Sequence, residues 1–389
     1  MMKAYLPKSF SIRIHTRMVL AAVLTAAALA IVPNPLSPAR VAHAADSMTE
    51  VTTYTANVGT SLGSTARATA VQSDGKILVG GSFTGFLRRF DADGTTDSAF
   101  NTNASTSVTN EVTGVGVQSD GKIIVVGGTV SVSGFVKRLN SDGTLDAAFN
   151  TNVGSTFNTQ LVRAIEIQSD GRIVVGGDFS GRLKRLTTTG TLDSTFNTNI
   201  GTNLNGAVHA ISIQRGGTDI VVTGAFSGYL KRFLTTGWPN TGFNTNVGSA
   251  LDGIGYGVAF LSSWAVVVGG SFTGKLKRFT NAGVLDSTYN TAIGSTIDNT
   301  VYGVAADVGS YDGVVVGGAF TGKLRRFAAD GAVNGSMNTT NLDGDVRAVN
   351  FPCSQILITG EFTGGSKRYT VDQDWAWSPI PSDTTQSSG

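Results

Sequence analysis

The sequence predicts an all-β protein, a seven-bladed β-propeller of four-stranded antiparallel blades. One phrase recurs seven times, each copy divides into short strand-like pieces, and no stretch after residue 44 shows helical periodicity. The fullest copy is Val-Gln-Ser-Asp-Gly-Lys-Ile-Leu-Val-Gly-Gly-Ser-Phe-Thr-Gly at residues 71–85. The glycine that ends the phrase lies at positions 85, 134, 181, 228, 274, 322 and 364. This spacing matches a propeller blade, whose repeats run from about 40 to 50 residues.

The third copy shows the expected order of elements within a blade. Residues 163–167 alternate apolar or small with polar, as a half-buried strand does, and an Asp-Gly hairpin turn follows at 170–171. Residues 173–177 form a continuous apolar run, typical of a strand that is buried on both faces. Residues 182–186 are expected to form the third strand, and 193–199 the fourth. The hairpin turns imply antiparallel pairing, which disfavours the alternative of an open solenoid.

The two ends of the repeat region complement each other. The early copies end in a segment such as Phe-Asn-Thr-Asn-Ile-Gly-Thr at 196–202, which the last copy lacks. A related segment, Tyr-Thr-Ala-Asn-Val-Gly-Thr, occurs at 54–60. We therefore expect an N-terminal strand within residues 51–62 to complete the last blade, with residues 374–378 as a competitor for that edge. The expected blades are 67–110, 111–160, 161–207, 208–253, 254–299, 300–344 and 345–371, in a propeller domain of 45–371 followed by a polar tail of 372–389.

The first 44 residues have the pattern of a cleavable signal peptide. A basic leader precedes an apolar run from Met18 to Val32, and Ala42-His43-Ala44 supplies a small-x-small cleavage site. We expect cleavage after Ala44, and a protein that is secreted or held at the cell surface. Residues 1–44 contain five of the 29 basic residues and none of the 27 acidic ones, so the mature chain is weakly acidic. This balance gives no reason to expect nucleic acid as a partner, and no later apolar run is long enough to span a membrane.

Every copy contains a pair of basic residues, and neighbouring side chains of a strand point to opposite faces, so the pairs form two rings. The first ring, which begins with Arg88 and Lys137, is expected to face solvent. The second ring is predicted to be structural, because Asp or Asn follows by eight residues in six copies and could accept a cross-strand hydrogen bond. A polyanion-binding arginine ring is the alternative. The second ring is Arg89, Arg138, Arg185, Arg232, Arg278, Arg326 and Arg368, and its expected acceptors are Asp97, Asp146, Asp193, Asn240, Asp286 and Asn334.

A polar loop before the first strand of each blade is the candidate ligand surface. In most copies an apolar residue is followed there by Asn or Asp, which is typical of an Asx turn with a buried anchor. The functional interpretation is a crown of amide and hydroxyl groups on one propeller face, suited to sugars or a partner protein. The candidate crown residues are Asn110, Asn158, Asn205, Asp252, Asp298 and Asp343.

The recurring phrase, followed by Arg-Phe or Arg-Leu and then by Asp-Gly-Thr-Leu-Asp-Ser-Thr-Phe, resembles the delta-60 repeat family of bacterial, mostly exported proteins. The resemblance covers nearly all of residues 51–371 and is close in copies one to three. Later copies are weaker, and copies five and seven lack the Asp-Gly turn. The resemblance implies a β-propeller. It implies no activity, since no common catalytic residue set goes with the repeat.

Patterns for catalysis or metal binding are scarce. His209 is the only histidine after residue 44, and Cys353 is the only cysteine of the chain. We therefore expect no metal site and no cofactor. The expected function is that of a monomeric, non-enzymatic binding or scaffold propeller whose partner is a glycan or an extracellular protein. A polysaccharide-active enzyme with carboxylates at the channel mouth and a structural cell-envelope component are the alternatives. Trp375 and Trp377 either pack on the closing blade or stack on sugars.

Overall fold

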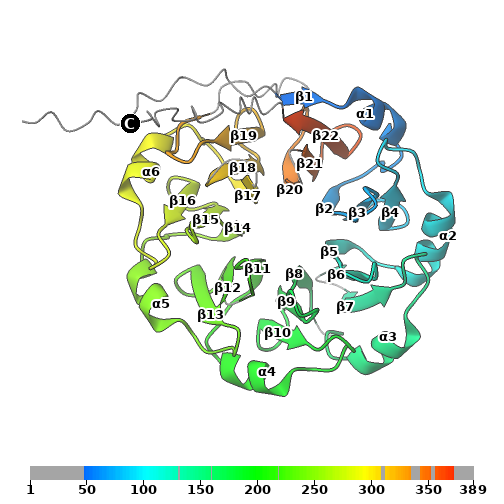
Figure 1. Cartoon of the computed structure of the whole chain (residues 1–389), viewed down its shortest axis with the longest axis horizontal. Coiled ribbons are helices and arrows are strands. Elements are labelled where there is room, and N and C mark those ends of the chain that lie inside the picture. Colours follow the sequence, from blue (N-terminus) through cyan, green and yellow to red (C-terminus); the bar gives the residue numbers. More distant parts are fainter. Residues whose placement is uncertain are drawn as a thin grey trace, which may run out of the picture. The chain divides into compact units, whose positions relative to one another are not determined.

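The computed structural model of the protein describes residues 48–129, 132–158, 160–217, 219–307, 312–333, 342–351 and 355–371. Residues 1–44, for which a signal peptide was predicted, lie outside these residues, as do Asn334, Cys353, Trp375 and Trp377. Within them the chain forms seven antiparallel sheets of three or four strands. Figure 1 shows the sheets around a common centre, with short helices on the outside. The prediction of an all-β propeller is confirmed.

Each sheet runs outward from an inner strand through a middle strand to an outer strand. The inner strands are β2 (Ala66–Val71), β5 (Val112–Val117), β8 (Val162–Ile167), β11 (Val208–Ile213), β14 (Gly255–Phe260), β17 (Val301–Asp307) and β20 (Val346–Asn350). The middle strands are β3 (Ile77–Gly81), β6 (Ile123–Thr129), β9 (Ile173–Gly177), β12 (Asp219–Gly224), β15 (Val266–Gly270), β18 (Gly313–Gly318) and β21 (Gln355–Gly360). The outer strands are β4 (Leu87–Phe90), β7 (Val132–Leu139), β10 (Leu183–Leu186), β13 (Leu230–Leu234), β16 (Leu276–Phe279), β19 (Leu324–Phe327) and β22 (Ser366–Val371).

The middle strands are mostly apolar because both of their faces contact neighbouring blades. All five residues of β9 are buried, for example. Their paired glycines let the next blade approach closely. A Cβ atom on Gly176 would lie 2.5 Å from Cγ1 of Val208, which is on the inner strand of the following blade. No other residue fits at such a distance.

The prediction of a fourth strand in each blade is wrong in five blades, where the segment forms a helix. These helices are α2 (Ser98–Ser107), α3 (Ala147–Val153), α4 (Ser194–Ile200), α5 (Thr241–Val247) and α6 (Ser287–Ile293). In α4, Asp193 caps the first turn by accepting a hydrogen bond from the Phe196 amide. Phe196 and Ile200 are four residues apart and therefore share the buried face of the helix. The only strand-like pairing left at this edge of the blade is a single bridge between Leu186 and Leu192.

The N-terminal segment does complete the last blade, but residues 54–60 do not form the expected strand. Instead β1 (Met48–Glu50) pairs antiparallel with β22, which gives the sheet order β1-β22-β21-β20. The predicted strand position is occupied by α1 (Thr52–Val58), the counterpart of the other outer helices. Tyr54 of α1 is buried, and its hydroxyl lies 3.0 Å from Oγ of Ser366. Tyr54 also shares a core cluster with Val79 of the first blade and Leu357 of the last, so these two blades pack together.

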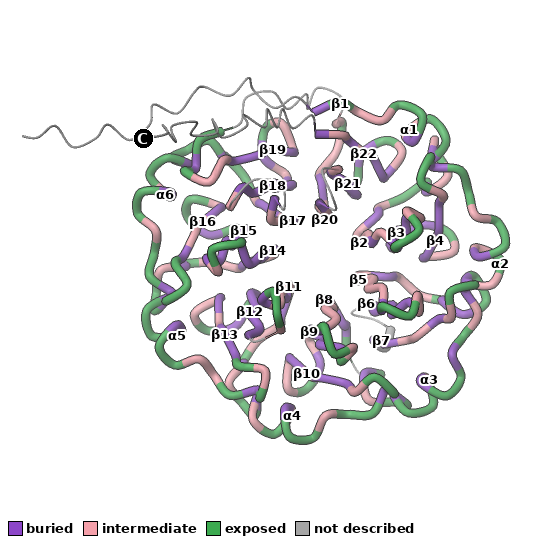
Figure 2. The backbone as a smooth tube through the Cα atoms, in the orientation of Figure 1, coloured by how far each residue is buried: buried purple, intermediate pink, exposed green. Residues whose placement is uncertain are grey.

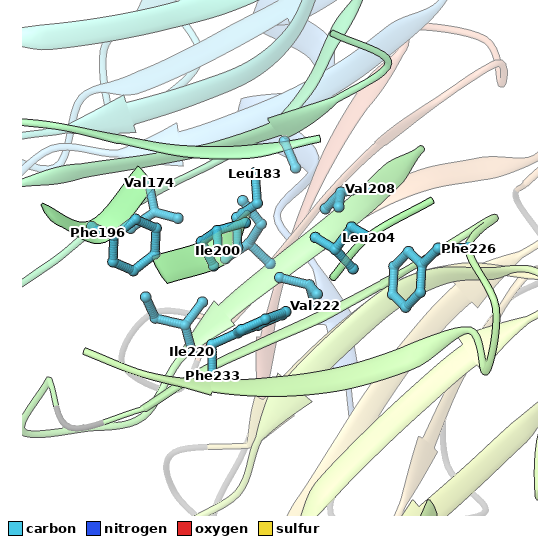
Figure 3. Packing of buried hydrophobic residues seen from close by; sticks show 12 residues of the cluster. Val174, Leu183, Phe196, Ile200, Leu204, Val208, Ile220, Val222, Phe226 and Phe233 are labelled. Atoms are coloured by element: carbon cyan, nitrogen blue, oxygen red, sulfur yellow. The ribbon is translucent and has the colours of Figure 1, made fainter. Parts of the chain in front are cut away.

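The hydrophobic core lies mainly between neighbouring blades. In the cluster of Figure 3, Val174 of β9 and Phe196 of α4 meet Val222 of β12 and Phe233 of β13. Figure 2 shows the same distribution around the ring, with buried strands between exposed turns. Burying one such side chain contributes about 1.5–3 kcal/mol. The interfaces between blades can therefore hold the ring together by packing, in a chain whose single cysteine allows no internal disulfide.

Candidate functional site

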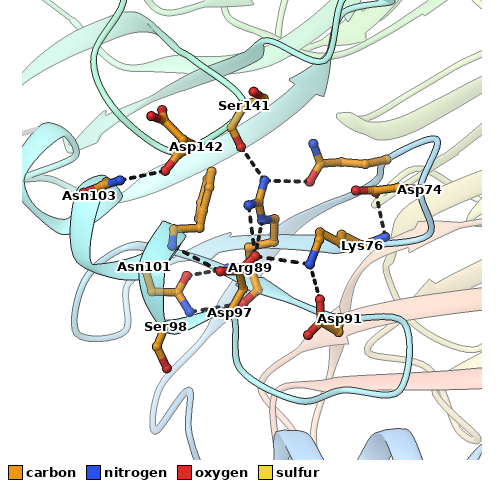
Figure 4. Close-up of polar contacts among 12 residues, drawn as sticks. Asp74, Lys76, Arg89, Asp91, Asp97, Ser98, Asn101, Asn103, Ser141 and Asp142 are labelled. Carbon is orange, nitrogen blue, oxygen red and sulfur yellow. Dashed lines mark hydrogen bonds and ion pairs between the residues drawn. The ribbon is translucent and has the colours of Figure 1, made fainter.

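The arginines of the second basic ring, called the interface arginines below, lie buried or half-buried at the outer part of the blades. Arg89 donates from Nε to Oδ2 of Asp97 at 3.0 Å and from its Nη1 atom to Oε1 of Gln72 at 3.3 Å (Figure 4). The same nitrogen donates to the Ser141 carbonyl of the next blade at 2.6 Å. Its guanidinium also covers the ring of Phe100, 4.0 Å from the centroid. With its donors engaged and 8% of the residue exposed, Arg89 is a link between blades and not a polyanion-binding group.

Most of the other interface arginines repeat this arrangement. Arg138, Arg185, Arg232 and Arg278 donate to a carbonyl of the blade that follows, and Arg368 of the last blade donates to the Ala92 carbonyl of the first. The carboxylate partners are Asp146 for Arg138, Asp193 for Arg185 and Asp286 for Arg278, and the carbonyls of the next blade belong to Thr188, Thr235 and Ala329.

Asn240 was predicted to accept from Arg232, and this prediction is wrong. Arg232 is paired instead with Asp219 of β12, with Nε 2.6 Å from Oδ2. Asn240 caps α5 and donates to the same Asp219 oxygen at 3.3 Å. A buried guanidinium needs a carboxylate, so where the helix cap is Asn the charge comes from the middle strand. Arg326 is likewise paired with Asp307, the last residue of β17, across 2.8 Å.

The eight-residue offset places Asp97 opposite Arg89 across a short hairpin turn, as predicted: the Asp97 amide donates to the Arg89 carbonyl at 3.1 Å, beside the bridge between Phe90 and Thr96. The predicted fourth strand does not follow, because Asp97 is also the N-cap of α2. Its Oδ1 accepts from the Phe100 amide while Oδ2 accepts from Arg89. One carboxylate thus starts the helix and compensates the arginine.

The Phe-Asn-Thr-Asn segment was predicted to be a strand followed by a polar loop. It is instead a helix, and this helix holds the outer strand. Asn101 accepts from the Arg89 amide at 2.7 Å and donates to the Arg89 carbonyl at 3.1 Å, as a neighbouring strand would. Asn103, two residues later, donates to the Asp142 carbonyl of the next blade at 3.0 Å (Figure 4). Both asparagines are therefore structural.

Four of the candidate crown residues are hydrogen-bonded within their own blade. Asp298 accepts from the Thr321 amide at 2.8 Å and from its hydroxyl at 2.5 Å, which ties the loop before β17 to the turn before β19. These bonds, the threonine hydroxyl first, lower the pKa of Asp298. Asp252 with Thr273, Asp343 with Thr363 and Asn205 with Ser227 form equivalent loop locks.

The remaining two crown residues do not form such a lock. Asn110 lies one position beyond the equivalent residue and accepts from the amide of Glu111 at 2.8 Å. Asn158 is exposed. The six predicted residues are thus not brought together into one continuous ligand surface.

The first basic ring is not simply solvated. Lys137 donates to the Ser107 carbonyl at 2.7 Å, and Lys277 donates to the Ala250 carbonyl at 2.7 Å. Burial lowers the pKa of Lys137. These lysines bind carbonyls in the segment that connects the preceding helix to the inner strand.

A group of residues that the sequence reasoning missed occupies the second position of every inner strand. These mouth residues are all half-buried, and they differ from blade to blade, whereas the residues beside them are small or aliphatic. Four of them, from β2, β5, β8 and β11, line a cavity of about 550 Å³ between the inner strands. The mouth residues are Arg67, Thr113, Arg163, His209, Tyr256, Tyr302 and Arg347.

The mouth residues of blades four to seven contact one another in an arc. The rings of His209 and Tyr256 stack, with centroids 5.2 Å apart and an interplanar angle of 13°. Tyr256 meets Tyr302 edge to face at 5.6 Å. The Arg347 guanidinium lies 4.1 Å from the Tyr302 ring centroid. A continuous aromatic and cationic strip therefore crosses four blades.

The arginines of the mouth carry carboxylate partners, but part of their hydrogen-bonding capacity stays available. Arg163 donates from Nε and Nη2 to the two oxygens of Asp178 at 2.9 and 2.8 Å. In the described part of the chain its Nη1 atom has no hydrogen-bond partner. Arg347 is paired with Glu361 at 2.7 Å, and Arg67 with Glu111. The pairs offer donors and acceptors side by side.

His209 is neutral near pH 7. Burial, with a further effect of the nearby Arg163, lowers the pKa of His209 to about 4. Its Nδ1 atom is buried and has no hydrogen-bond partner among the described residues.

Two absences apply to the described part of the chain. No helix there has the length and apolar character needed to cross a membrane. No group of three or more His, Cys, Asp or Glu side chains there could hold a metal ion.

Comparison with known proteins supports a β-propeller repeat. A family described as a domain of unknown function (DUF5122) β-propeller matches residues 72–100, 118–149 and 168–196. The first match begins at Gln72 and ends at Phe100, the two residues that contact Arg89 from either side. The second and third begin and end at the corresponding contacts of Arg138 and Arg185. The matched unit therefore coincides with the surroundings of one interface arginine.

Solved structures show the same fold at low identity. A catalytically inactive virginiamycin B lyase from Staphylococcus aureus, with quinupristin, is 14% identical with a TM-score of 0.51, over 84% of this chain and 99% of that one. The WD40 β-propeller domain of Doa1 is 13% identical with a TM-score of 0.58, over 81% and 95%. No curated protein matches the chain. These likenesses concern the fold alone.

Proposed function

We propose that the protein is an exported, non-enzymatic binding module of the delta-60 repeat type, and that it binds a glycan at the mouth residues. The observation that carries this proposal is the arc from His209 through Tyr256 and Tyr302 to Arg347, beside a cavity of about 550 Å³. The site lies at the start of the inner strands, on the face that also carries the loop locks. It replaces the loop crown as the ligand surface.

The chemistry of the mouth suits a sugar. Aromatic rings offer apolar faces for the C–H side of a pyranose, while paired Arg and Asp or Glu side chains offer adjacent donors and acceptors for hydroxyl groups. The Nη1 atom of Arg163, which has no hydrogen-bond partner among the described residues, adds a donor. Ligand cavities usually measure about 300–1,000 Å³, so this one has room for a sugar unit.

The alternative of a polysaccharide-active enzyme is less well supported by this geometry. Glycosidases use two carboxyl groups about 5–10 Å apart on either side of the scissile bond. Among the described residues that line the cavity, Glu166 is the only carboxylate. The nearby Asp178 and Glu361 are held in ion pairs with arginines. The lyase among the similar structures indicates a shared fold and no shared chemistry.

A glycan array with the chain from Ala45 onward tests the proposal, together with turnover assays on every hit. We expect binding without turnover, and loss of binding in Tyr256→Ala. Trp238→Ala is the matched control, because Trp238 is an aromatic residue that is 57% exposed and lies outside the mouth. Product formation from a bound glycan would overturn the non-enzymatic proposal. An equal loss of glycan binding in both variants would overturn the assignment of the mouth as the binding site.

Export is proposed on the leader sequence. We propose that cleavage after Ala44 releases a monomeric protein that is secreted or retained at the cell surface. The mass of the protein recovered from the culture medium or cell envelope checks this directly. A chain that keeps residues 1–44 would contradict the cleavage, and a dimer in light scattering would contradict the monomer.

A further inference from the structure

Deeper in the cavity lies a carboxylate that the proposed contacts at the mouth do not use. Glu166 of β8 lines the cavity together with Asn350 of β20. Glu166 accepts a hydrogen bond from the backbone of its neighbour Ile167. No ion pair and no side-chain hydrogen bond to Glu166 is seen among the described residues. Burial raises the pKa of Glu166 to about 7.

The other charges that line this cavity are compensated. Arg67 is paired with Glu111, and Arg163 with Asp178. His209 is neutral because burial lowers its pKa. Glu166 is therefore the one uncompensated ionisable group among the described lining residues, and its charged form is negative. A cationic group placed there would gain an ion pair in surroundings where water screens charges weakly.

An ammonium group fits this position better than a metal ion. Calcium takes six to eight oxygen ligands, and magnesium about six. The described residues offer no group of three metal-ligating side chains. A primary ammonium has three N–H donors, which the Glu166 carboxylate could accept, and Asn350 offers an amide oxygen to the same cavity from β20 across the centre. Ala70, Gly116 and Ala305 also line the cavity, and their small side chains leave space for the group.

We propose that the cavity takes a primary ammonium group of the ligand, with Glu166 as its counter-ion and Asn350 as a further acceptor. The inference rests on the proposed glycan function for the rest of the ligand, and it names the ligand class as an amino sugar with a free amine. The aromatic strip would then hold the ring of the sugar while its amine reaches inward.

Carboxyl ¹³C NMR can follow Glu166 directly, because the chain contains four glutamates, Glu50, Glu111, Glu166 and Glu361. The probes are glucosamine, N-acetylglucosamine and n-propylammonium, each titrated into the mature protein at pH 7. We expect glucosamine to bind about tenfold tighter than its N-acetyl form, as a hydrogen bond to a charged group allows. We also expect glucosamine to move the Glu166 resonance toward the ionised position.

Glu166→Gln should abolish the preference for the free amine while N-acetylglucosamine binding persists. Asp170→Asn is the matched control, since Asp170 is an exposed carboxylate in the turn directly after β8. Asn350→Leu is a second variant in case Glu166→Gln does not fold, and it should weaken the same preference. Equal affinities for the two sugars, or a preference that survives Glu166→Gln, would overturn the inference.

The aliphatic amine separates this inference from the proposed function. If no sugar binds but n-propylammonium still moves the Glu166 resonance, the glycan function fails and the ammonium site stands. If sugars bind and neither amine moves that resonance, the ammonium site fails and the glycan function stands.

Discussion

In the outer part of the ring the same polar side chains make the same bonds in successive blades, whereas at the channel mouth the seven blades present four residue types. Arg89 and Arg185 have equivalent partners, and both are nearly buried. Arg163 and Tyr302 occupy equivalent positions and share no chemistry. Identity between repeats thus marks the groups that join blades, and variation at a half-buried position marks the groups that are free to serve a ligand.

Removal of an interface arginine should have the largest effect on stability. Arg185→Ala leaves Asp193 half-buried without its charge partner and removes the link to the Thr235 carbonyl. We expect the free energy of unfolding to fall by about 3–5 kcal/mol, measured by urea denaturation. Arg182→Ala, three residues away at a turn, is the control. If the free energy of unfolding falls less in Arg185→Ala than in the control, the repeated bonds do not hold the blades together.

Acid should weaken the same part of the molecule. Although burial opposes it, hydrogen bonds from Lys122, from the Phe149 amide and from Arg138 lower the pKa of Asp146 to about 2. A carboxyl whose pKa is depressed in the folded state stabilises the fold above its ordinary pKa, here 3.8, and loses this contribution as the pH falls toward 2. Thermal unfolding of Asp146→Asn across this range should show a smaller pH dependence than the parent chain. An unchanged slope would contradict the assignment.

The loop locks should matter less, because they are exposed to water. Asp298→Ala removes two hydrogen bonds from Thr321. The resulting fall in unfolding temperature should be several-fold smaller than the fall caused by Arg185→Ala. Differential scanning calorimetry of the two variants compares them. A loss as large as that of Arg185→Ala would place the crown residues among the main supports of the ring.

A change at the mouth should have the smallest effect on stability and a clear effect on binding. Tyr302→Ala removes the ring between Tyr256 and Arg347 at a half-buried position. We expect glycan affinity to fall about tenfold, with a change in unfolding temperature smaller than that of Asp298→Ala. Isothermal titration calorimetry of a glycan found on the array checks this. Unfolding of the variant would instead assign Tyr302 to the fold.

The sequence predicted the features that depend on repetition. A period near 47 residues and the Asp-Gly turns led to a propeller, and the eight-residue offset correctly linked Arg89 to Asp97 across a hairpin turn. The outer helices were missed because a seven-residue helix such as α4 shows only Phe196 and Ile200 as buried positions. Two apolar residues are too few to reveal a helical period.

The mouth residues were missed because the predictions rested on residues that recur in every copy, whereas the mouth residues vary from blade to blade. Arg163, His209 and Tyr256 could have been found by aligning the seven copies at the Ala, Val or Gly that begins each inner strand. The residue after it changes between cationic, aromatic and hydroxyl types while its neighbours stay small. Glu166 gave a weaker signal, since only its three-dimensional surroundings show that it lacks a partner.

The bonds that the interface arginines donate to a neighbouring blade run in one direction around the circle wherever the structure describes them. Arg89 reaches a carbonyl of the blade that is made after it, and Arg368 reaches the Ala92 carbonyl of the blade made first. The interface arginine of a newly made blade therefore has no carbonyl to bind until the next blade is made. Only the arginine of the last blade finds its acceptor carbonyl already present. Apart from the short strand β1, nothing in this pattern marks a beginning, so a circularly permuted gene opened at a different turn would encode the same network of contacts.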